Sequence, residues 1–277
     1  MTRPGPSGRY PEGLMCEASV EPFLLFEHVN VARGSQRVLH DINLSIRPGE
    51  NVVILGPNGC GKSTLIKAMT CEIYPLFEPG MRVRIFGRER WDLQELRRRL
   101  GVVSPELPGK PTLKTTGLDA VVSGFFSSST LWPNLTITDE MRSKAEDALR
   151  LVEGEVLADK FVGQMSAGQQ RRVMIARALV RSNEMLLLDE PSNALDIAAQ
   201  RSLRLTLRSL AQRGTGILLI THHIEDILPE IERVIMMRDG RIVADGAKRD
   251  LLTGKRLSQL FDTEVELRER DGFYSMA

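Results

Sequence analysis

Short apolar runs and amphipathic stretches alternate along most of the chain. Residues 24–46 alternate apolar and polar positions, which predicts two half-buried strands joined by a turn at 33–36. Residues 51–55 read as a short apolar strand that leads into a helix at 65–69. Residues 81–86 alternate again and predict an antiparallel strand. The first third therefore predicts an antiparallel layer beside a strand–helix unit.

The middle of the chain favours helices. Residues 91–100 place leucines at helical spacing opposite three arginines at 97–99, which we interpret as a solvated helix face. Residues 113–152 keep helical periods with a polar break at 127–130, which predicts a mostly helical insertion. Its aromatic residues form either the insertion's own small core or an apolar docking patch for a partner. They are Phe125, Phe126 and Trp132.

Alternation of strands and helices returns after residue 184. Strands at 185–188 and 217–220 flank a helix at 197–210, and a short helix starts at Ile224. A final hairpin crosses Asp239-Gly240. This order predicts an α/β fold with a mainly parallel sheet covered on both faces.

Composition and charge describe an ordinary globular protein. Of 277 residues, 42% are hydrophobic and 26% charged, and the net charge of +1 predicts no nucleic-acid partner. Three cysteines without paired spacing suit a reducing cytosol. No apolar run reaches the length of a membrane span, so a membrane role would need a span from another chain.

These patterns also suggest domain boundaries. Residues 1–22 are rich in Pro and Gly without an apolar signal core, and we expect a disordered lead-in. Residues 23–251 would form the main domain, with the helical insertion at about 107–180. Residues 252–277 would form a polar, partly helical tail.

A glycine-rich segment before the first helix fits the phosphate-binding pattern Gly-x-x-x-x-Gly-Lys-Ser. We expect Gly56, Gly59 and Gly61 to adopt positive φ, so that several N–H groups approach one anion. Lys62 would supply a charge to the β and γ phosphates, and the Ser63 hydroxyl a ligand for Mg²⁺. The loop comprises Gly56, Pro57, Asn58, Gly59, Cys60, Gly61, Lys62, Ser63 and Thr64.

Two acids follow the apolar strand at 185–188. Asp189 and Glu190 would emerge at the carboxyl end of the strand, where α/β sheets bind ligands. Asp189 could hold Mg²⁺, while Glu190 could act as the general base toward an attacking water. A third segment, at 164–172, places Ser166 as a helix N-cap and Gly168 in the first turn.

The motifs together resemble the ATP-binding cassette (ABC) ATPases, a P-loop NTPase family, over residues 26–251. They occur in the family's order: the phosphate loop, Met-Ser-Ala-Gly-Gln in place of Leu-Ser-Gly-Gly-Gln, Leu-Leu-Leu-Asp-Glu-Pro, Ser192-Asn193-Ala194-Leu195-Asp196, and Thr221-His222. The resemblance implies an N-terminal antiparallel β subdomain and an inserted helical subdomain.

The resemblance also implies a homodimer that sandwiches two ATP molecules. Each phosphate loop would face the signature of the partner, which is the Met-Ser-Ala-Gly-Gln segment at 165–169. Ser166, Gly168 and Gln169 would then contact the γ-phosphate bound by the other copy. Asp196 would span the interface. His222 would contact the γ-phosphate and hold the geometry of attack. We expect His223 to be incidental. We also expect no metal pair of the adjacent His222 and His223, because neighbours on a strand point to opposite faces.

Three positions invite comment. Arg33 stands where the family usually carries an aromatic that stacks on adenine, and its guanidinium plane could take over that role. Pro105 stands where a glutamine usually reaches Mg²⁺ and the attacking water, which favours slow hydrolysis and unconventional coupling, with Glu106 a weak substitute. Cys60 is either a small neutral filler or a redox brake on nucleotide binding.

Two functions fit these observations. The first is the ATPase subunit of a membrane transporter, cytoplasmic and peripheral at the inner face of the membrane through separate permease chains that dock on the helical insertion. Import is favoured, since family exporters often fuse membrane and cassette parts. The second is a soluble ABC ATPase that acts as a mechanical switch on a macromolecular partner, a hypothesis that Pro105 keeps open.

Overall fold

The computed structural model describes residues 21–106, 108–181 and 184–276. The proposed lead-in at 1–22 therefore lies almost wholly outside the described residues. The first layer is an antiparallel sheet of β1 (Leu24–Arg33), β2 (Gln36–Ile46) and β4 (Arg82–Ile85), in the order β2-β1-β4. Arg33 pairs with Gln36 across a two-residue turn, as the alternating pattern predicts.

A six-stranded sheet forms the second layer, in the order β5-β6-β7-β3-β8-β9. All neighbours from β5 to β8 pair in parallel, and β9 pairs antiparallel with β8 across Asp239-Gly240. The predicted mainly parallel α/β sheet is confirmed. The strands are β3 (Val52–Leu55), β5 (Leu100–Val103), β6 (Met185–Asp189), β7 (Gly216–Thr221), β8 (Arg233–Arg238) and β9 (Arg241–Ala247).

Two apolar cores lie on the two faces of this central sheet. Successive side chains of a strand point to opposite faces, so each strand contributes to both cores. Val53 and Leu55 of β3 belong to the core on the helical side, while Val52 and Ile54 belong to the core under the antiparallel layer. A continuous apolar run is therefore what this position in the fold requires.

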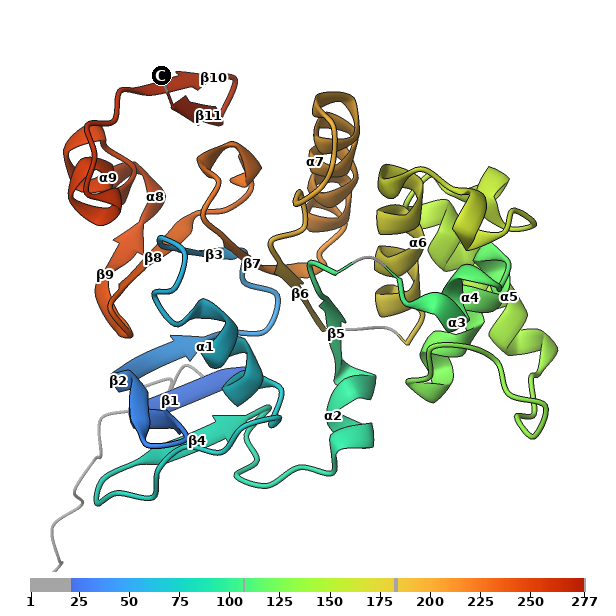
Figure 1. Cartoon of the computed structure of the whole chain (residues 1–277), viewed down its shortest axis with the longest axis horizontal. Coiled ribbons are helices and arrows are strands. Elements are labelled where there is room, and N and C mark those ends of the chain that lie inside the picture. Colours follow the sequence, from blue (N-terminus) through green and yellow to red (C-terminus); the bar gives the residue numbers. More distant parts are fainter. Residues whose placement is uncertain (1–20, 107, 182–183, 277) are drawn as a thin grey trace, which may run out of the picture.

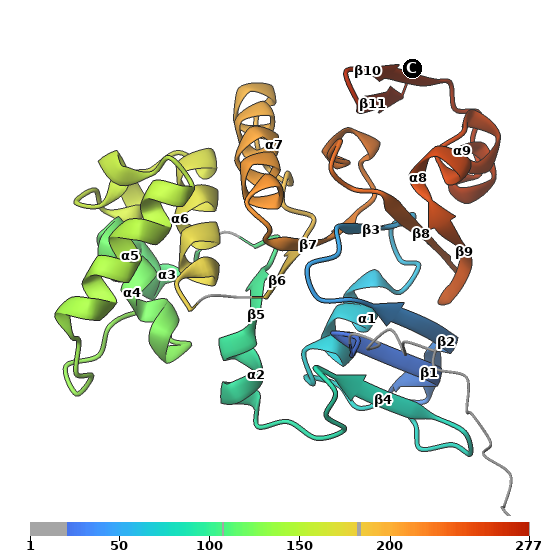
Figure 2. The same cartoon turned by 180° about the vertical axis from the view of Figure 1, so that it is seen from behind.

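Helices complete the layers, as Figure 1 and the reverse view in Figure 2 show. Helix α1 (Lys62–Met69) lies between the two sheets, α2 (Leu93–Arg99) precedes β5, and α7 (Ile197–Gln212) follows β6. The predicted helix at 91–100 ends one residue early, because Leu100 is the first residue of β5.

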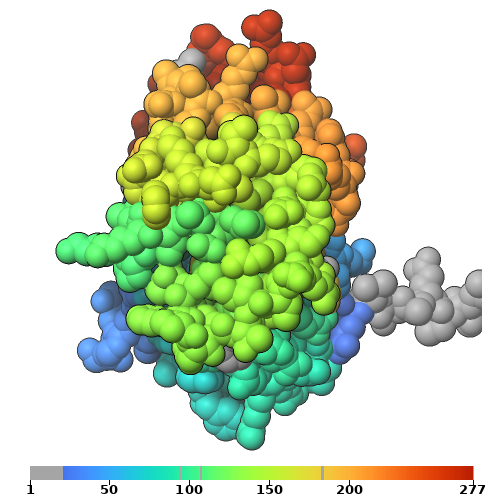
Figure 3. Space-filling view, turned by 90° about the vertical axis from the view of Figure 1, so that its right-hand side faces the viewer, coloured from blue at the N-terminus to red at the C-terminus, as the bar shows by residue number. Residues whose placement is uncertain are grey.

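The insertion forms a separate helical lobe beyond β5 and β6 (Figures 1 and 3). Its elements are α3 (Lys110–Leu113), α4 (Gly117–Val122), η1 (Ser123–Phe126), α5 (Asp139–Leu151), η2 (Glu155–Leu157), η3 (Val162–Gln164) and α6 (Ala167–Leu179). Phe125 and Phe126 pack against the helical-side core, whereas Trp132 is 57% exposed. The two phenylalanines therefore pack inward, but against a core shared with the central sheet and not against a core of the insertion's own.

The C-terminal segment packs against the main domain more closely than a polar tail would. Helices α8 (Lys248–Leu251) and α9 (Gly254–Phe261) precede an unpredicted hairpin of β10 (Leu267–Arg270) and β11 (Phe273–Met276). Leu252, Leu257 and Leu260 are buried in the helical-side core. None of the described helices is both long enough and apolar enough to cross a membrane.

Candidate nucleotide site

The phosphate loop connects the buried strand β3 to the first turn of α1. Gly59 and Gly61 have φ values of 80° and 105°, a conformation that glycine adopts without strain. The predicted positive φ of Gly56 is wrong, since it is absent from the positive-φ residues. A Cβ at Gly56 would lie 2.3 Å from the Met237 carbonyl oxygen, so this glycine permits close approach to β8.

Lys62 is 6% exposed at the start of α1. Its Nζ donates to the carbonyl oxygens of Gly56 at 2.7 Å and Pro57 at 3.1 Å. The same ammonium lies 3.4 Å from Glu190 Oε1. These contacts hold the positive charge beside the loop's N–H groups and next to the general-base candidate.

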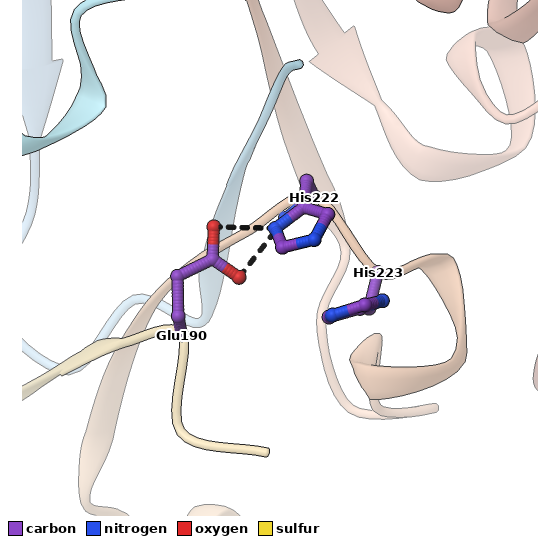
Figure 4. A group of neighbouring side chains, drawn as sticks. All are labelled: Glu190, His222 and His223. Carbon is purple, nitrogen blue, oxygen red and sulfur yellow. Dashed lines mark hydrogen bonds and ion pairs between the residues drawn. The ribbon is translucent and has the colours of Figure 1, made fainter. Parts of the chain in front are cut away.

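Glu190 follows β6 in a strained backbone conformation. Its φ is 43°, and its N–H donates to the Ile220 carbonyl of β7 at 2.8 Å. The Glu190 carboxylate accepts from the Thr221 hydroxyl at 3.2 Å and the His222 N–H at 3.3 Å. His222 Nδ1 lies 2.8 Å from Glu190 Oε1 (Figure 4). A costly local conformation kept by neighbouring contacts is a recurrent feature of active sites.

Asp189 lies at the carboxyl end of β6, where the apolar run predicts it. Burial, and next the negative charge of Glu190, raise the pKa of Asp189 to about 6. A carboxylate held in partly buried surroundings gains from a nearby cation. The Asp189 carboxylate and the Ser63 hydroxyl line one cavity and offer the oxygen ligands that Mg²⁺ prefers, so these residues fit that ion.

A cavity of about 450 Å³ brings Arg33 and six residues of the phosphate loop together with Asp189 and Glu190. It includes both positions that depart from the family pattern, Arg33 and Pro105. The exposed Arg33 side chain is thus available to a base, and Pro105 lines the same cavity as the two acids. The lining residues are Arg33, Gln36, Val38, Asn58, Gly59, Gly61, Lys62, Ser63, Thr64, Pro105, Asp189 and Glu190.

The signature residues line a second cavity, of about 310 Å³, that shares none of these residues. Ser166 Oγ accepts from Gln169 N at 3.3 Å, and Gln169 Oε1 accepts from Ser166 N at 3.1 Å, which forms a reciprocal cap of α6. A Cβ at Gly168 would lie 2.9 Å from Ala199 Cβ, so this glycine lets α6 pack closely on α7. Asp196 caps α7 through Ala199 N at 2.7 Å.

One functional contact was not predicted from the sequence. Arg171 on α6 is 2% exposed, and its guanidinium donates to the carbonyl oxygens of Ser104 and, at 2.7 Å, of Pro105. It therefore ties α6 to the segment that follows β5. The sequence does not indicate which of the two adjacent arginines, 171 and 172, is buried, because the Pro105 carbonyl that Arg171 contacts lies 66 residues away along the chain.

Two further expectations are decided by the structure. The expected separation of His222 and His223 on opposite faces is wrong: β7 ends at Thr221, and the two rings lie 3.8 Å apart. Cys60 is 4% exposed, and burial raises the pKa of its thiol, so the filler interpretation fits.

The comparisons with known proteins agree with this geometry. The family model described as ABC transporter matches residues 39–193. The ABC transporter ATP-binding protein YlmA of Bacillus subtilis is 32% identical over 88% of this chain and 92% of its own length. The hemin import ATP-binding protein HmuV of Aliivibrio fischeri is 33% identical over 82% of this chain and 86% of its own.

Solved structures add the fold and a dimeric relative. The cassette MJ0796, described as the dimeric structure of a bacterial ABC transporter cassette, superposes with a TM-score of 0.65. It is 28% identical and covers 81% of this chain and 98% of its own. Family match, identity and site geometry agree: this chain belongs to the ABC transporter family and is an ATP-binding cassette ATPase.

Proposed function

We propose that this chain is the ATPase subunit of a membrane transporter and works through separately encoded permease chains, in the direction of import. The observation that carries the shared ATPase site of this proposal is the division of the predicted nucleotide-binding residues between two cavities. Lys62 and Glu190 line one, and Ser166 and Asp196 line the other. One chain alone therefore leaves the signature without the phosphates it would contact, and a second copy supplies them.

In the proposed homodimer, each ATP lies between the phosphate loop of one copy and the signature of the other. The N–H groups of the loop and Lys62 hold the β and γ phosphates. The N-terminus of the partner's α6 adds a positive helix end at the γ-phosphate. Closing of the dimer on ATP, and reopening after hydrolysis, is the movement that would drive a permease.

The hydrolytic step depends on Glu190. Its carboxylate takes a proton from the attacking water as the water oxygen bonds to the γ-phosphorus and the bond to the ADP oxygen breaks. His222 and Lys62, both in contact with Glu190, orient and balance the charge of the phosphoryl group. Mg²⁺ held by Ser63 and Asp189 would supply charge neutralisation between the β and γ phosphates.

The relatives support transport and import. HmuV is described as a hemin import ATP-binding protein, and FbpC of Rhizobium etli, 34% identical over 86% of this chain and 64% of its own length, as an Fe(3+) ions import ATP-binding protein. We therefore place this chain at the inner face of the membrane, with the permease docked on the helical lobe.

A specific observation favours a second candidate, a soluble switch on a macromolecular partner. Pro105 occupies the hinge where the family glutamine serves both hydrolysis and permease coupling, and Arg171 fixes that hinge through two carbonyl groups. A stiff hinge without the glutamine suits a partner other than a permease.

The test is capture of the closed dimer. Tagged Glu190→Gln protein should bind ATP but hydrolyse it poorly, and it is isolated from its native cells with ATP, Mg²⁺ and mild detergent. The matched control adds Lys62→Ala, which removes the phosphate-binding charge. Stoichiometric copurification of an integral membrane protein with Glu190→Gln, but not with the double variant, is the expected result. Ribosomes, DNA or only soluble proteins would favour the switch instead.

A further inference from the structure

Three metal-ligating side chains converge at the catalytic end of the central sheet. Glu190 follows β6, and His222 and His223 follow β7, its neighbour in the sheet. One ligand atom from each of the three lies within 4.8 Å of the other two. Figure 4 shows the Glu190 carboxylate directed at the His222 ring, with the His223 ring beside it. Nothing in the hydrolytic step uses His223.

The His222 ring is poised for a further ligand. Its Nδ1 is buried and forms no hydrogen bond to any described residue, although Glu190 Oε1 lies 2.8 Å away at ion-pair distance. A buried polar atom without a hydrogen bond is costly, and coordination of a cation removes that cost. The lone pairs of a neutral imidazole and a carboxylate are the ligands that a divalent transition metal accepts.

The separations are compatible with one ion after small side-chain rotations. Metal–ligand bonds near 2.1 Å place two ligands of a tetrahedral ion about 3.4 Å apart. The widest separation here is at most 4.8 Å, so the side chains need to approach by about 1.4 Å in the least favourable pair. His222 and His223 are only half-buried beyond the end of β7, which leaves room for that movement.

We propose that Glu190, His222 and His223 form an inhibitory site for a divalent transition metal such as Zn²⁺. Two imidazoles select such an ion over Mg²⁺, which prefers oxygen ligands and retains its waters. The bound ion occupies the carboxylate that would accept the proton of the attacking water and the imidazole that would face the γ-phosphate. The ion therefore stops hydrolysis while it is bound.

One neighbouring group opposes the ion. The Lys62 ammonium lies 3.4 Å from Glu190 Oε1 and repels a second cation. The metal and the γ-phosphate would both take the His222 imidazole, so nucleotide and metal compete for that ring. Metal binding is consequently strongest in the nucleotide-free protein.

The direct test is Zn²⁺ binding to the nucleotide-free full chain, measured by competition with a chromophoric chelator. We expect one Zn²⁺ per chain. The His223→Asn variant should bind Zn²⁺ at least about tenfold more weakly, because loss of a residue that only supports a metal ligand already costs about that much affinity. His223→Asp, which retains a ligand atom, keeps more of the affinity. His28→Asn is the matched control, because His28 also lies 2.8 Å from a carboxylate, that of Asp41.

The functional readout is the ATPase rate at fixed Mg²⁺ with increasing Zn²⁺. His223→Asn should hydrolyse ATP at the wild-type rate without Zn²⁺ and resist inhibition to concentrations about tenfold higher. A chelator should restore the wild-type rate. Equal Zn²⁺ affinity of wild type and His223→Asn, or no Zn²⁺ binding to the wild type, would overturn the proposal. Both outcomes are independent of whether the partner is a permease.

Discussion

The two cavities that carry the predicted nucleotide-binding residues are built on different principles. The phosphate-loop cavity contains buried or partly buried charges that act on one another, Lys62, Asp189 and Glu190. The signature cavity contains a capped helix start and the exposed Asp196, which already accepts a hydrogen bond within its own chain. The first cavity offers charged side chains, and the second offers mainly the N-terminus of a helix.

This difference indicates which cavity serves hydrolysis and which serves assembly of the dimer. Charges that lie in contact within one chain are oriented before the substrate arrives, and such preorganisation is the larger part of electrostatic catalysis. A helix N-terminus is effective only against an anion placed at its end. We therefore expect substitutions in the first cavity to impair ATP hydrolysis, and substitutions in the second to impair ATP-dependent dimerisation.

The largest effect should come from Glu190→Gln. Loss of the general base should lower the rate of phosphate release by about 10²–10⁴-fold, while ATP affinity changes little. Single-turnover phosphate release and equilibrium ATP binding separate the two quantities. A variant that loses ATP binding in parallel would contradict the division of labour between the cavities.

Pro105→Gln should have the next largest effect. A side-chain amide at this position could reach Mg²⁺ and the attacking water, so we expect hydrolysis to become about tenfold faster through better positioning. Pro105→Ala is the control, because it removes the ring without adding a ligand and should not accelerate the reaction. An unchanged rate in Pro105→Gln would show that the missing glutamine is not what limits this cavity.

A smaller loss is expected for Arg33→Ala. An exposed guanidinium stacked on a base contributes about 0.5–1 kcal/mol, which corresponds to a few-fold weaker ATP binding. Inorganic tripolyphosphate, which has no base, should bind equally to variant and wild type. Arg37→Ala serves as the control, since Arg37 pairs with Glu78 at 2.6 Å. Equal ATP affinities of Arg33→Ala and wild type would remove the stacking role.

The smallest effect concerns Asp226, a 4% exposed acid behind the first cavity. Burial raises its pKa above the ordinary 3.8, against hydrogen bonds from Ser192 at 2.5 Å and Thr221 at 3.2 Å and the charges of His223 and Arg204. The folded state thus holds this proton more tightly than the unfolded chain. Its ionisation lowers stability as pH rises from about 3.8 to the raised pKa.

Asp226→Asn removes that titration. As pH rises through this window, the free energy of unfolding of the variant should increase relative to that of the wild type. Above the window the difference between the two should stay constant. Denaturant unfolding at several pH values measures it. A difference that is the same at every pH would show that Asp226 has an ordinary pKa.

The local chemistry of the fold and the site could be predicted from the sequence. The apolar run before Asp189 places two acids at the end of a central strand, and Lys62 follows from the spacing of the loop glycines. What could not be predicted depends on distant neighbours. Gly56 is required by the Met237 carbonyl, 181 positions further along the chain, and not by its own φ.

The same reason accounts for the other failures. The burial of Arg171 depends on the carbonyl groups of Ser104 and Pro105, which no local pattern reveals. The contact of His222 with His223 depends on where β7 ends. The hairpin of β10 and β11 was missed because Leu267–Arg270 has no buried residue and so shows no alternation of burial.

Subunit complementation tests the central claim, that two copies share each ATPase site. Glu190→Gln and Ser166→Arg chains are each expected to be inactive as homodimers. A mixed dimer joins the intact phosphate-loop cavity of one copy to the intact signature of the other, so the mixture should recover about a quarter of the wild-type rate, since half of randomly paired dimers carry one intact site of two. A mixture as inactive as its separate components would contradict the shared site.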